Sequence, residues 1–371
     1  MPVRSRPLAP VLVLLLLVAL VPVLPAAAQT VPGAVERDYW PTDGWRAAAP
    51  EAHGIDPAAL AAVDARVPSE TPDLSALLVV RHGYLVFERS YNGYDPAEPI
   101  NVRSVTKSVT GALIGIALAE GHISGLDQTV GELIPDRIPP DADPRVADVT
   151  LEQLLEMTSG LAWDAGSDWP TLTASDDWVA LTLGQPVVGV PGQTYVYNTG
   201  GSHLLSVIVE AATGQDAEEY ARDKLFGPLG IEPGDWPRSP QGEPSGGSGL
   251  ELTARDMAKL GYLFLNQGSW DGEQIVPADY ALAATTYQSA GDATGGWANY
   301  GYQWWITATD FGYPAYFALG YGGQHIFVVP ALDLVVVAAV ERRVPREELR
   351  TPRYLIESIA AATVPDLPGG A

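Results

Sequence analysis

The sequence contains no cysteine among its 371 residues, which excludes disulfides, cysteine-ligated zinc, iron–sulfur clusters and thiol nucleophiles. Basic residues are also scarce. There are 21 Lys and Arg against 45 Asp and Glu, a formal net charge of -24, and only three of the basic residues are lysines. Because no stripe of basic residues is available to neutralise phosphates, we do not expect the protein to bind nucleic acid.

The first 28 residues have the order of a secretory signal peptide. Arg4 and Arg6 precede an unbroken apolar run over residues 11–21, and prolines and the small residues Ala26–Ala28 follow. The pattern predicts cleavage after Ala28. The alternative is a membrane anchor, but the apolar run is shorter than the ~20 residues that span a bilayer. We therefore expect a secreted or periplasmic protein with no stable membrane insertion after cleavage.

The rest of the chain divides into an N-terminal extension over residues 29–50 and one domain over residues 51–371. Strand-like segments occur near both ends of this domain, and the region from about 125 to 250 alternates helical runs with Pro- and Gly-rich loops. The distribution predicts an α/β (α+β) fold with one sheet assembled from both ends and a mostly helical insert between them. The expected strands are 77–80, 85–87, 302–306, 326–329 and 334–340, and the expected helices include 56–67, 104–120, 253–265 and 347–362.

A Ser-x-x-Lys sequence at the start of the 104–120 helix is the first pattern that suggests chemistry. Ser104 and Lys107 lie one helical turn apart on one face, within about 5–6 Å between Cβ atoms. A serine hydroxyl needs an adjacent base to act as a nucleophile, and a lysine with a lowered pKa can supply it. The spacing also occurs by chance on surface helices. The apolar run that follows, with Gly111 and Gly115, instead indicates a buried helix that another element approaches closely.

With these residues the sequence resembles the serine β-lactamase-related hydrolases, of the class C β-lactamase and penicillin-binding-protein type. Within that family it looks most similar to the esterases and amidases that resemble 6-aminohexanoate-dimer hydrolases. The likeness extends from the stretch 39–46 to Val340 and includes Leu154–Leu161 (LLEMTSGL) and the segment 249–259. It implies a β-lactamase-like fold, with an antiparallel sheet flanked by helices and an inserted helical region.

The resemblance also implies a catalytic tyrosine, and the Leu204–Leu205 pair selects Tyr197 for this role. Tyr195 remains the alternative, and a tyrosine that only packs beneath the sheet is the non-catalytic interpretation. Thr199 stands where many members carry an Asn that contacts the substrate amide, so the resemblance does not extend to this contact. A phenol beside Lys107 would relay a proton to the leaving group.

The third element of the family usually contains Lys-Thr-Gly or His-x-Gly on a strand that lines the site. Here the segment Gly320–Gln324 (GYGGQ) stands in that place. The resemblance implies an oxyanion hole made by the backbone N–H groups of Ser104 and Gly323. We expect Trp163, Thr199, Tyr321 and Gln324 to line the substrate pocket, and we considered His325 as a less favoured neighbour of the site.

Other catalytic patterns are missing from the sequence. No serine lies in Gly-x-Ser-x-Gly, and the five histidines form no metal-binding spacing. We therefore predict a secreted serine hydrolase that cleaves a small-molecule ester or amide, with Ser104, Lys107 and Tyr197 as catalytic residues and no metal or organic cofactor. The alternatives are a β-lactamase or D-Ala-D-Ala peptidase, or a non-catalytic ligand-binding or cell-wall-binding protein on the same scaffold.

Overall fold

The computed structural model describes residues 37–164, 166–291, 299–341 and 352–366. The chain divides into two units, Met1–Val35 and Glu36–Ala371, and all of the described residues belong to the second. The predicted signal peptide lies outside the described residues. The first part of the predicted helix 347–362, up to residue 351, also lies outside them.

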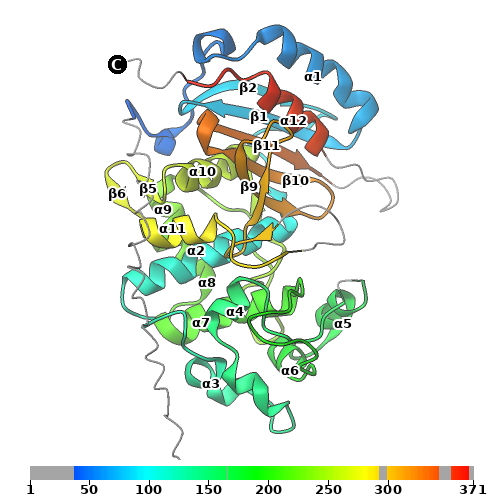
Figure 1. Cartoon of the computed structure of the whole chain (residues 1–371), viewed down its shortest axis with the longest axis vertical. Helices are drawn as coiled ribbons and strands as arrows, with labels where there is room; N and C mark the ends of the chain where they lie inside the picture. The colour runs from blue at the N-terminus through cyan, green and yellow to red at the C-terminus, as the bar shows by residue number, and fades with distance from the viewer. Residues whose placement is uncertain (1–36, 165, 292–298, 342–351, 367–371) are drawn as a thin grey trace, which may run out of the picture. The chain divides into compact units, whose positions relative to one another are not determined.

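A seven-stranded antiparallel sheet forms the centre of the second unit (Figure 1). Its strand order is β2-β1-β11-β10-β9-β8-β7, so strands from both ends of the chain lie next to each other. This confirms the expected sheet assembled from the two ends. The strands are β1 (Leu74–Arg81), β2 (Tyr84–Ser90), β7 (Asn299–Tyr300), β8 (Trp305–Ala308), β9 (Pro314–Gly320), β10 (Gln324–Val329) and β11 (Leu334–Val340); β3 (Ile100–Asn101) pairs with β4 (Glu251–Leu252), and β5 (Ser269–Trp270) with β6 (Glu273–Gln274).

Helices cover both faces of this sheet. The helices α1 and α12 lie on one face, and α10 and α2 lie on the other, with the helical insert beyond α2 (Figure 1). The helices are α1 (Pro57–Glu70), α2 (Thr106–Ala119), α3 (Val130–Leu133), α4 (Leu151–Leu155), α5 (Asp168–Ala174), α6 (Trp178–Leu183), α7 (Thr199–Thr213), α8 (Ala217–Ala221), α9 (Gly227–Leu229), α10 (Ala254–Leu265), α11 (Ala278–Ala284) and α12 (Arg353–Ala361). Single-turn 3₁₀ segments, including Arg103–Val105, join several of them.

The two faces of the sheet belong to two hydrophobic clusters. Along β11, Val335, Val337 and Ala339 join the cluster with α2 and α10. Their neighbours Leu334, Val336, Ala338 and Val340 join the cluster with α1 and α12. Since successive strand side chains point to opposite faces, a strand covered on both sides must be apolar throughout. This explains the continuous apolar sequence of the strand.

Local signals in the sequence account for several helix positions. The side chain of Asp56 accepts a hydrogen bond from Ala58 N at 2.9 Å, and Pro57 occupies the first turn of α1, as predicted. Gly115 on α2 allows close packing, because a Cβ there would lie 2.5 Å from the ring of Tyr280. The sheet also contains a strand that we did not predict, β9, and β8 begins later than the expected 302–306 segment.

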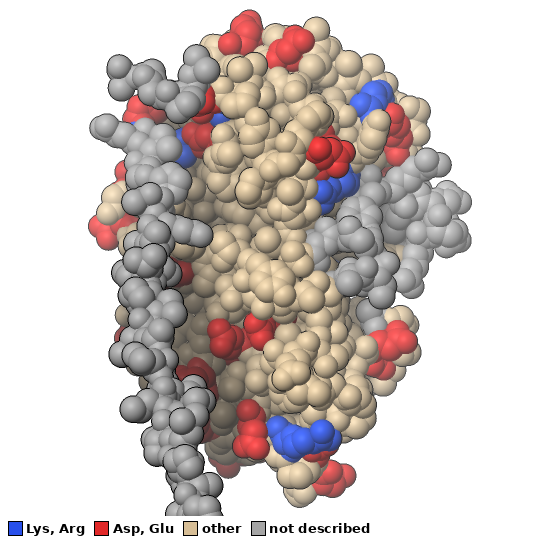
Figure 2. Space-filling view, in the orientation of Figure 1, with Lys and Arg blue, Asp and Glu red and all other residues tan. Residues whose placement is uncertain are grey.

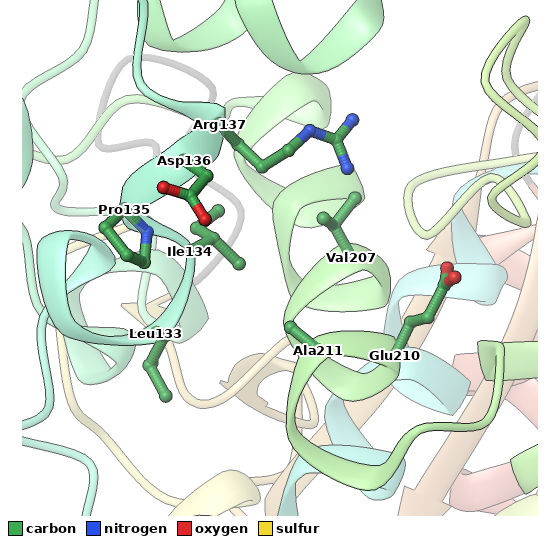
Figure 3. Close-up of a pocket in the computed structure, with 8 residues that line it drawn as sticks. All are labelled: Leu133, Ile134, Pro135, Asp136, Arg137, Val207, Glu210 and Ala211. Carbon is green, nitrogen blue, oxygen red and sulfur yellow. The ribbon is translucent and has the colours of Figure 1, made fainter.

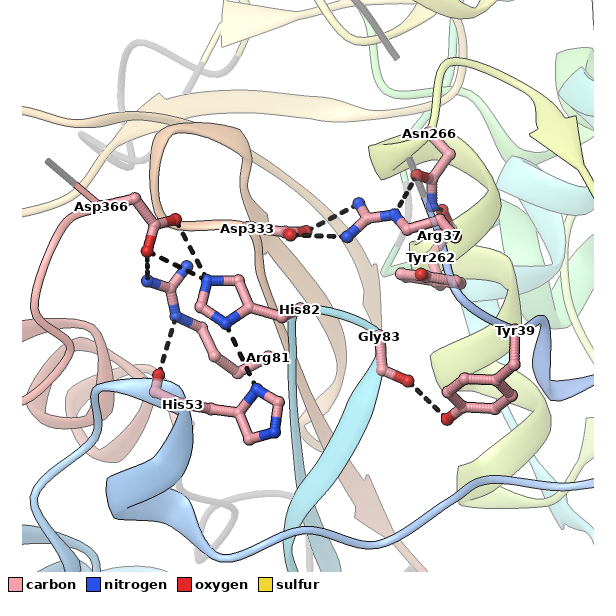
Figure 4. Close-up of polar contacts among 10 residues, drawn as sticks. All are labelled: Arg37, Tyr39, His53, Arg81, His82, Gly83, Tyr262, Asn266, Asp333 and Asp366. Carbon is pink, nitrogen blue, oxygen red and sulfur yellow. Dashed lines mark hydrogen bonds and ion pairs between the residues drawn. The ribbon is translucent and has the colours of Figure 1, made fainter. Parts of the chain in front are cut away.

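Both ends of the described unit are tied to the sheet by polar contacts (Figure 4). Arg37 forms a bidentate ion pair with Asp333, at 2.6 and 2.9 Å, and both side chains are largely buried. At the other end, the buried guanidinium of Arg81 donates to Val364 O and to the carboxylate of Asp366. Residues 37–50, predicted as an extension, therefore pack on the domain.

The described part of the surface in Figure 2 shows acidic side chains in small scattered groups, with few basic ones among them. Uncharged residues cover most of the remainder of this face. Among the described residues, no helix combines the length and the apolar composition that crossing a membrane requires.

Candidate active site

Ser104 lies on a tight turn between β3 and α2, which we call the nucleophile turn (residues 101–104). The side chain of Asn101 accepts a hydrogen bond from Arg103 N at 3.0 Å, and Thr106 Oγ1 donates to Arg103 O at 2.6 Å. Arg103 adopts a left-handed backbone conformation with φ of 54°. A non-glycine residue in this region carries strain, which is common beside functional groups. The turn presents Ser104 at the first turn of a helix, where backbone N–H groups lack intrahelical acceptors.

Lys107 extends from the next helical turn to three oxygen atoms. Its Nζ lies 3.1 Å from Ser104 Oγ, 3.2 Å from Thr199 Oγ1 and 2.6 Å from Gly247 O. Only 1% of the Lys107 surface is exposed, and Nζ contacts no carboxylate within the described ranges. Burial lowers the pKa of Lys107 from 10.5 to about 7, because the charged ammonium loses its hydration. The amine is therefore substantially neutral near pH 7 and can accept a proton from Ser104.

Tyr197 closes the group of three residues that we predicted. Lys107 Nζ lies 5.0 Å from the centroid of the Tyr197 ring, and the ring stacks on Trp305 with centroids 5.4 Å apart. Burial raises the pKa of Tyr197 to about 12, and a hydrogen bond with the Ser104 hydroxyl partly opposes this shift. Tyr195 packs against Tyr300 and Trp305. The position of Tyr197 beside Lys107 and Ser104 favours the register that we chose.

The departure at Thr199 has a structural explanation. Asn198 precedes α7 as its N-cap, and its side chain accepts a hydrogen bond from Gly201 N at 2.8 Å. Thr199 is the first residue of the helix and directs its hydroxyl to Lys107 Nζ. The third Lys107 partner, Gly247 O, was not predicted. It belongs to the loop 232–249, where only the close succession of Gly and Ser indicated an unusual backbone.

The loop between β9 and β10 lies against the nucleophile turn. A Cβ on Gly320 would lie 2.3 Å from Val102 O, so only glycine allows this approach. The Gly323 N–H, predicted as an oxyanion donor, instead donates to Gly320 O at 3.1 Å within the turn. It could contribute to an oxyanion hole only by sharing that hydrogen. Tyr321, at the tip of the turn, is 40% exposed.

Two of the expected pocket residues have different surroundings. The side chain of Gln324 is buried and bonds to backbone groups, so it does not face an open pocket. Trp163 is half-buried, and its ring would lie 2.9 Å from a Cβ on Gly200, which places it next to the start of α7. Its indole N–H is buried and has no acceptor among the described residues.

His325 packs on the opposite side of the sheet from these residues. It is buried, its Nδ1 lies 2.9 Å from Gly323 O, and its ring stacks on Phe317, which belongs to the cluster with α1 and α12. Burial lowers the pKa of His325 to about 4. These surroundings favour a core histidine. No group of three or more His, Asp or Glu within the described ranges is arranged to hold a metal ion.

A separate pocket of about 260 Å³ lies between α3 and the C-terminal half of α7 (Figure 3). Val207 of α7, which lines it, is eight residues beyond Thr199, or about 12 Å along a helix. Arg137 on its wall forms an ion pair with Glu243 at 2.8 Å. The pocket therefore lies apart from Ser104. Its lining consists of Leu133, Ile134, Pro135, Asp136, Arg137, Val207, Glu210 and Ala211.

The structure thus places a serine beside a tyrosine and a buried lysine of lowered pKa, on a helix that packs against an antiparallel sheet. This is the arrangement that the resemblance to the serine hydrolases implied. The family model for Beta-lactamase matches residues 71–361, and the chain belongs to this family. The family assignment and the fold are thus confirmed.

Known proteins similar to the chain include hydrolases and penicillin-binding-protein homologues. A 6-aminohexanoate-dimer hydrolase of Paenarthrobacter ureafaciens is 26% identical over 286 residues, which cover 71% of each protein. The solved structure of EstCE1, a hydrolase with promiscuous acyltransferase activity, has a TM-score of 0.65 at 17% identity and covers 82% of this chain and 97% of EstCE1. A penicillin-binding-protein homologue of Caulobacter crescentus has a TM-score of 0.64 at 19% identity, over 83% and 99% of the two chains.

Proposed function

We propose that this protein is a serine hydrolase that cleaves ester or amide bonds through an acyl-enzyme on Ser104. The observation that carries the proposal is the contact between Ser104 Oγ and a buried Lys107 with a pKa of about 7. A lysine on the protein surface would remain protonated at neutral pH and could not act as a base.

The partners of Lys107 favour one orientation of its lone pair. A neutral amine has two N–H donors and one acceptor site. Gly247 O can only accept, and the Thr199 hydroxyl can accept the second N–H. The lone pair is then left for the Ser104 hydroxyl, 3.1 Å away. This set of contacts therefore prepares Lys107 to receive the proton.

The reaction follows from these positions. As Ser104 Oγ attacks the carbonyl carbon, its proton passes to Lys107, and the Ser104 N–H hydrogen-bonds the oxyanion that forms. The C–O or C–N bond to the leaving group breaks, and Tyr197 relays the proton from Lys107 to the departing atom. Water then attacks the acyl-enzyme, with Lys107 and Tyr197 working in the reverse direction.

Two observations support a proposal for the substrate class. The protein of Paenarthrobacter ureafaciens is named as a hydrolase of the 6-aminohexanoate dimer, and the similarity covers 71% of each protein. The segment Gly320–Gln324 lacks the Lys and Thr with which β-lactamases and penicillin-binding proteins hold a substrate carboxylate. We therefore propose neutral or cationic short-chain esters and amides as substrates.

A fluorophosphonate probe tests the nucleophile. The wild-type protein should be labelled at Ser104, and Ser104→Ala should be unlabelled and inactive but folded, since the change removes one hydroxyl on a turn. Turnover of aryl esters, 6-aminohexanoate oligomers, D-amino-acid peptides and β-lactams then defines the class. A folded wild-type protein that is neither labelled nor active on any of them would point to a non-catalytic binding protein, and retained activity in Ser104→Ala would exclude the mechanism.

We also propose that the protein is exported and that residues 1–28 are removed. The charge and apolar pattern of this segment supports the proposal. Cleavage after Ala28 leaves Arg37 and its ion pair with Asp333 in place. N-terminal sequencing of protein recovered outside the cytoplasm should begin at Gln29. An uncleaved N-terminus in the membrane fraction would indicate an anchor instead.

A further inference from the structure

Gln324 connects three parts of the molecule that meet beside Ser104. It is the first residue of β10, opposite Gly320 at the end of β9. Its side chain is 1% exposed. The amide Oε1 accepts a hydrogen bond from Val340 N at 2.9 Å, and Nε2 donates to Val340 O and, at 3.3 Å, to Asn101 O. All of these acceptors and donors belong to the backbone.

The two bonds to Val340 extend the sheet beyond its last backbone pair. The pairing between β10 and β11 ends with His325 opposite Ala338. In an antiparallel ladder the backbone N–H and C=O groups of every second residue point to the same neighbouring strand. After Ala338, the next residue of β11 whose backbone groups point toward β10 is therefore Val340. The Gln324 amide supplies the N–H and C=O groups that a backbone partner would supply there. The side chain is therefore held in one orientation.

The third bond joins this fixed amide to the nucleophile turn. Asn101, whose carbonyl accepts it, uses its side chain to hold Arg103 N and thereby shapes the turn before Ser104. Gly320 also approaches the nucleophile turn closely, at Val102 O. Among the described residues, Gln324 thus provides a side-chain bond between the nucleophile turn and the central sheet.

We propose that Gln324 is a positioning residue that holds the nucleophile turn against the β9–β10 turn and so fixes the place of the Ser104 N–H and Oγ. The proposal rests on the proposed function and deepens it. Such a residue acts on the tetrahedral intermediate, because a shift of the Ser104 N–H matters most when negative charge develops on the substrate oxygen. Its loss should lower kcat and leave KM nearly unchanged.

The test compares two buried glutamines in the full-length protein. Gln324→Met keeps the side-chain length and removes the polar amide. Gln303→Met is the control, because Gln303 is also buried and also bonds to backbone carbonyls, those of Leu154 and Leu155, but it does not bond to the nucleophile turn. Urea unfolding measures the loss of stability in each variant, and steady-state kinetics on an aryl ester that the wild type hydrolyses measures kcat and KM.

We expect kcat to fall about 10- to 100-fold in Gln324→Met, with KM within about threefold, since displacing a catalytic group by about 1 Å can cost 10²-fold. Phenylboronic acid, which forms a tetrahedral anion on a nucleophilic serine, should bind more weakly by a similar factor. Gln303→Met should lose stability but keep kcat within about threefold.

Two outcomes would overturn the inference: a kcat for Gln324→Met within twofold of the wild type, or an equal loss of kcat in Gln303→Met. If Gln324→Met does not fold, Gln324→Glu makes the same comparison, because it keeps the side-chain size and the bond from Val340 N but loses the donors to Asn101 O and Val340 O. A wild-type protein that neither hydrolyses esters nor labels at Ser104 would instead refute the proposed function.

Discussion

Replacing Lys107 by methionine should abolish activity and make the protein more stable at neutral pH. The side chain is buried, and its pKa is about 7 in the folded protein instead of 10.5. At pH 7 the unfolded chain holds this proton almost completely and the folded protein holds about half of it. The lower pKa in the folded state corresponds to about 4 kcal/mol of lost folding stability at pH 7, relative to a side chain that is neutral in both states. Methionine has nearly the same length and no charge to desolvate.

The gain is reduced by the hydrogen bonds that the amine makes. Without Nζ, the buried Gly247 O and the Thr199 hydroxyl lose a partner, which costs about 1–3 kcal/mol. The net stabilisation of Lys107→Met at pH 7 should therefore be about 1–3 kcal/mol. Catalysis should be lost completely, because a thioether cannot accept the Ser104 proton.

The pH dependence of the stability difference distinguishes two causes of stabilisation, which are the removal of a desolvated charge and the better packing of methionine. Because the pKa of Lys107 is lower in the folded than in the unfolded state, the unfolded state binds more protons between pH 7 and 10.5, and stability of the wild type rises with pH in this window. The rise reaches about 1.4 kcal/mol per pH unit in the middle of this window, where the folded protein has released the proton and the unfolded chain still holds it. The advantage of Lys107→Met should accordingly shrink as the pH increases and disappear by about pH 10.

Urea unfolding of both proteins at pH 7, 8.5 and 10 measures this difference. Other titrating groups are shared by the two proteins, so their contributions cancel in the comparison. Lys259→Met controls for activity, because Lys259 is also buried but bonds to Thr42 O and Gly230 O away from Ser104, and this variant should remain active. The reasoning fails if Lys107→Met is less stable than the wild type at pH 7, or if the difference is independent of pH.

Three further predictions concern the reaction itself. Tyr197→Phe should lower kcat by about 10²–10⁴-fold on an aryl ester, and Tyr195→Phe should have little effect; the reverse order would mean that our tyrosine register is wrong. The kcat/KM of the wild type should rise with pH to a plateau with a midpoint near pH 7, because Lys107 must be neutral, and a profile without a step in this range would argue against Lys107 as the base. The kcat/KM for a neutral aryl ester should exceed that for a chromogenic cephalosporin by at least about 10-fold, because the charge-assisted hydrogen bond to the missing strand lysine would contribute about 1.5–3 kcal/mol and the net charge of -24 repels anions. Equal rates for the two substrates would favour the β-lactamase alternative.

The parts of the site that are close in sequence could be predicted from the sequence. Ser104 and Lys107 are three residues apart, so the helix that contains them determines their contact whatever the rest of the chain does. The apolar residues after Lys107 indicated burial, and burial is the cause of its lowered pKa. Capping residues in the sequence also gave the starts of α1 and α10, whose N-caps are Asp56 and Thr253, although α1 continues to Glu70, three residues beyond its predicted end.

Contacts between distant segments were harder to predict, because no local pattern specifies them. Gly247 lies 140 residues from Lys107, and its contribution is a backbone carbonyl that any residue type would carry. Gln324 was predicted to line the pocket because it is polar and close to the expected oxyanion hole. In the structure its amide instead bonds to the backbone of Val340 at the end of β11. The strand β9 went unrecognised because Gly312 and Pro314 at its start resemble a loop, although strands on both sides supply its hydrogen bonds.

Two energetically unfavourable features lie within three residues of Ser104. Arg103 has a left-handed backbone, which costs about 1–2 kcal/mol in a non-glycine residue, and Lys107 is buried without a carboxylate partner among the described residues. Neither feature stabilises the protein, and both determine the position or the basicity of the groups around the Ser104 hydroxyl. The continuous apolar strands β1 and β11, covered by helices on both faces, provide stability elsewhere in the domain that can offset these costs. The strain and the desolvated base therefore favour the proposed catalytic role over an inert binding protein on the same scaffold, which would gain stability by losing either one.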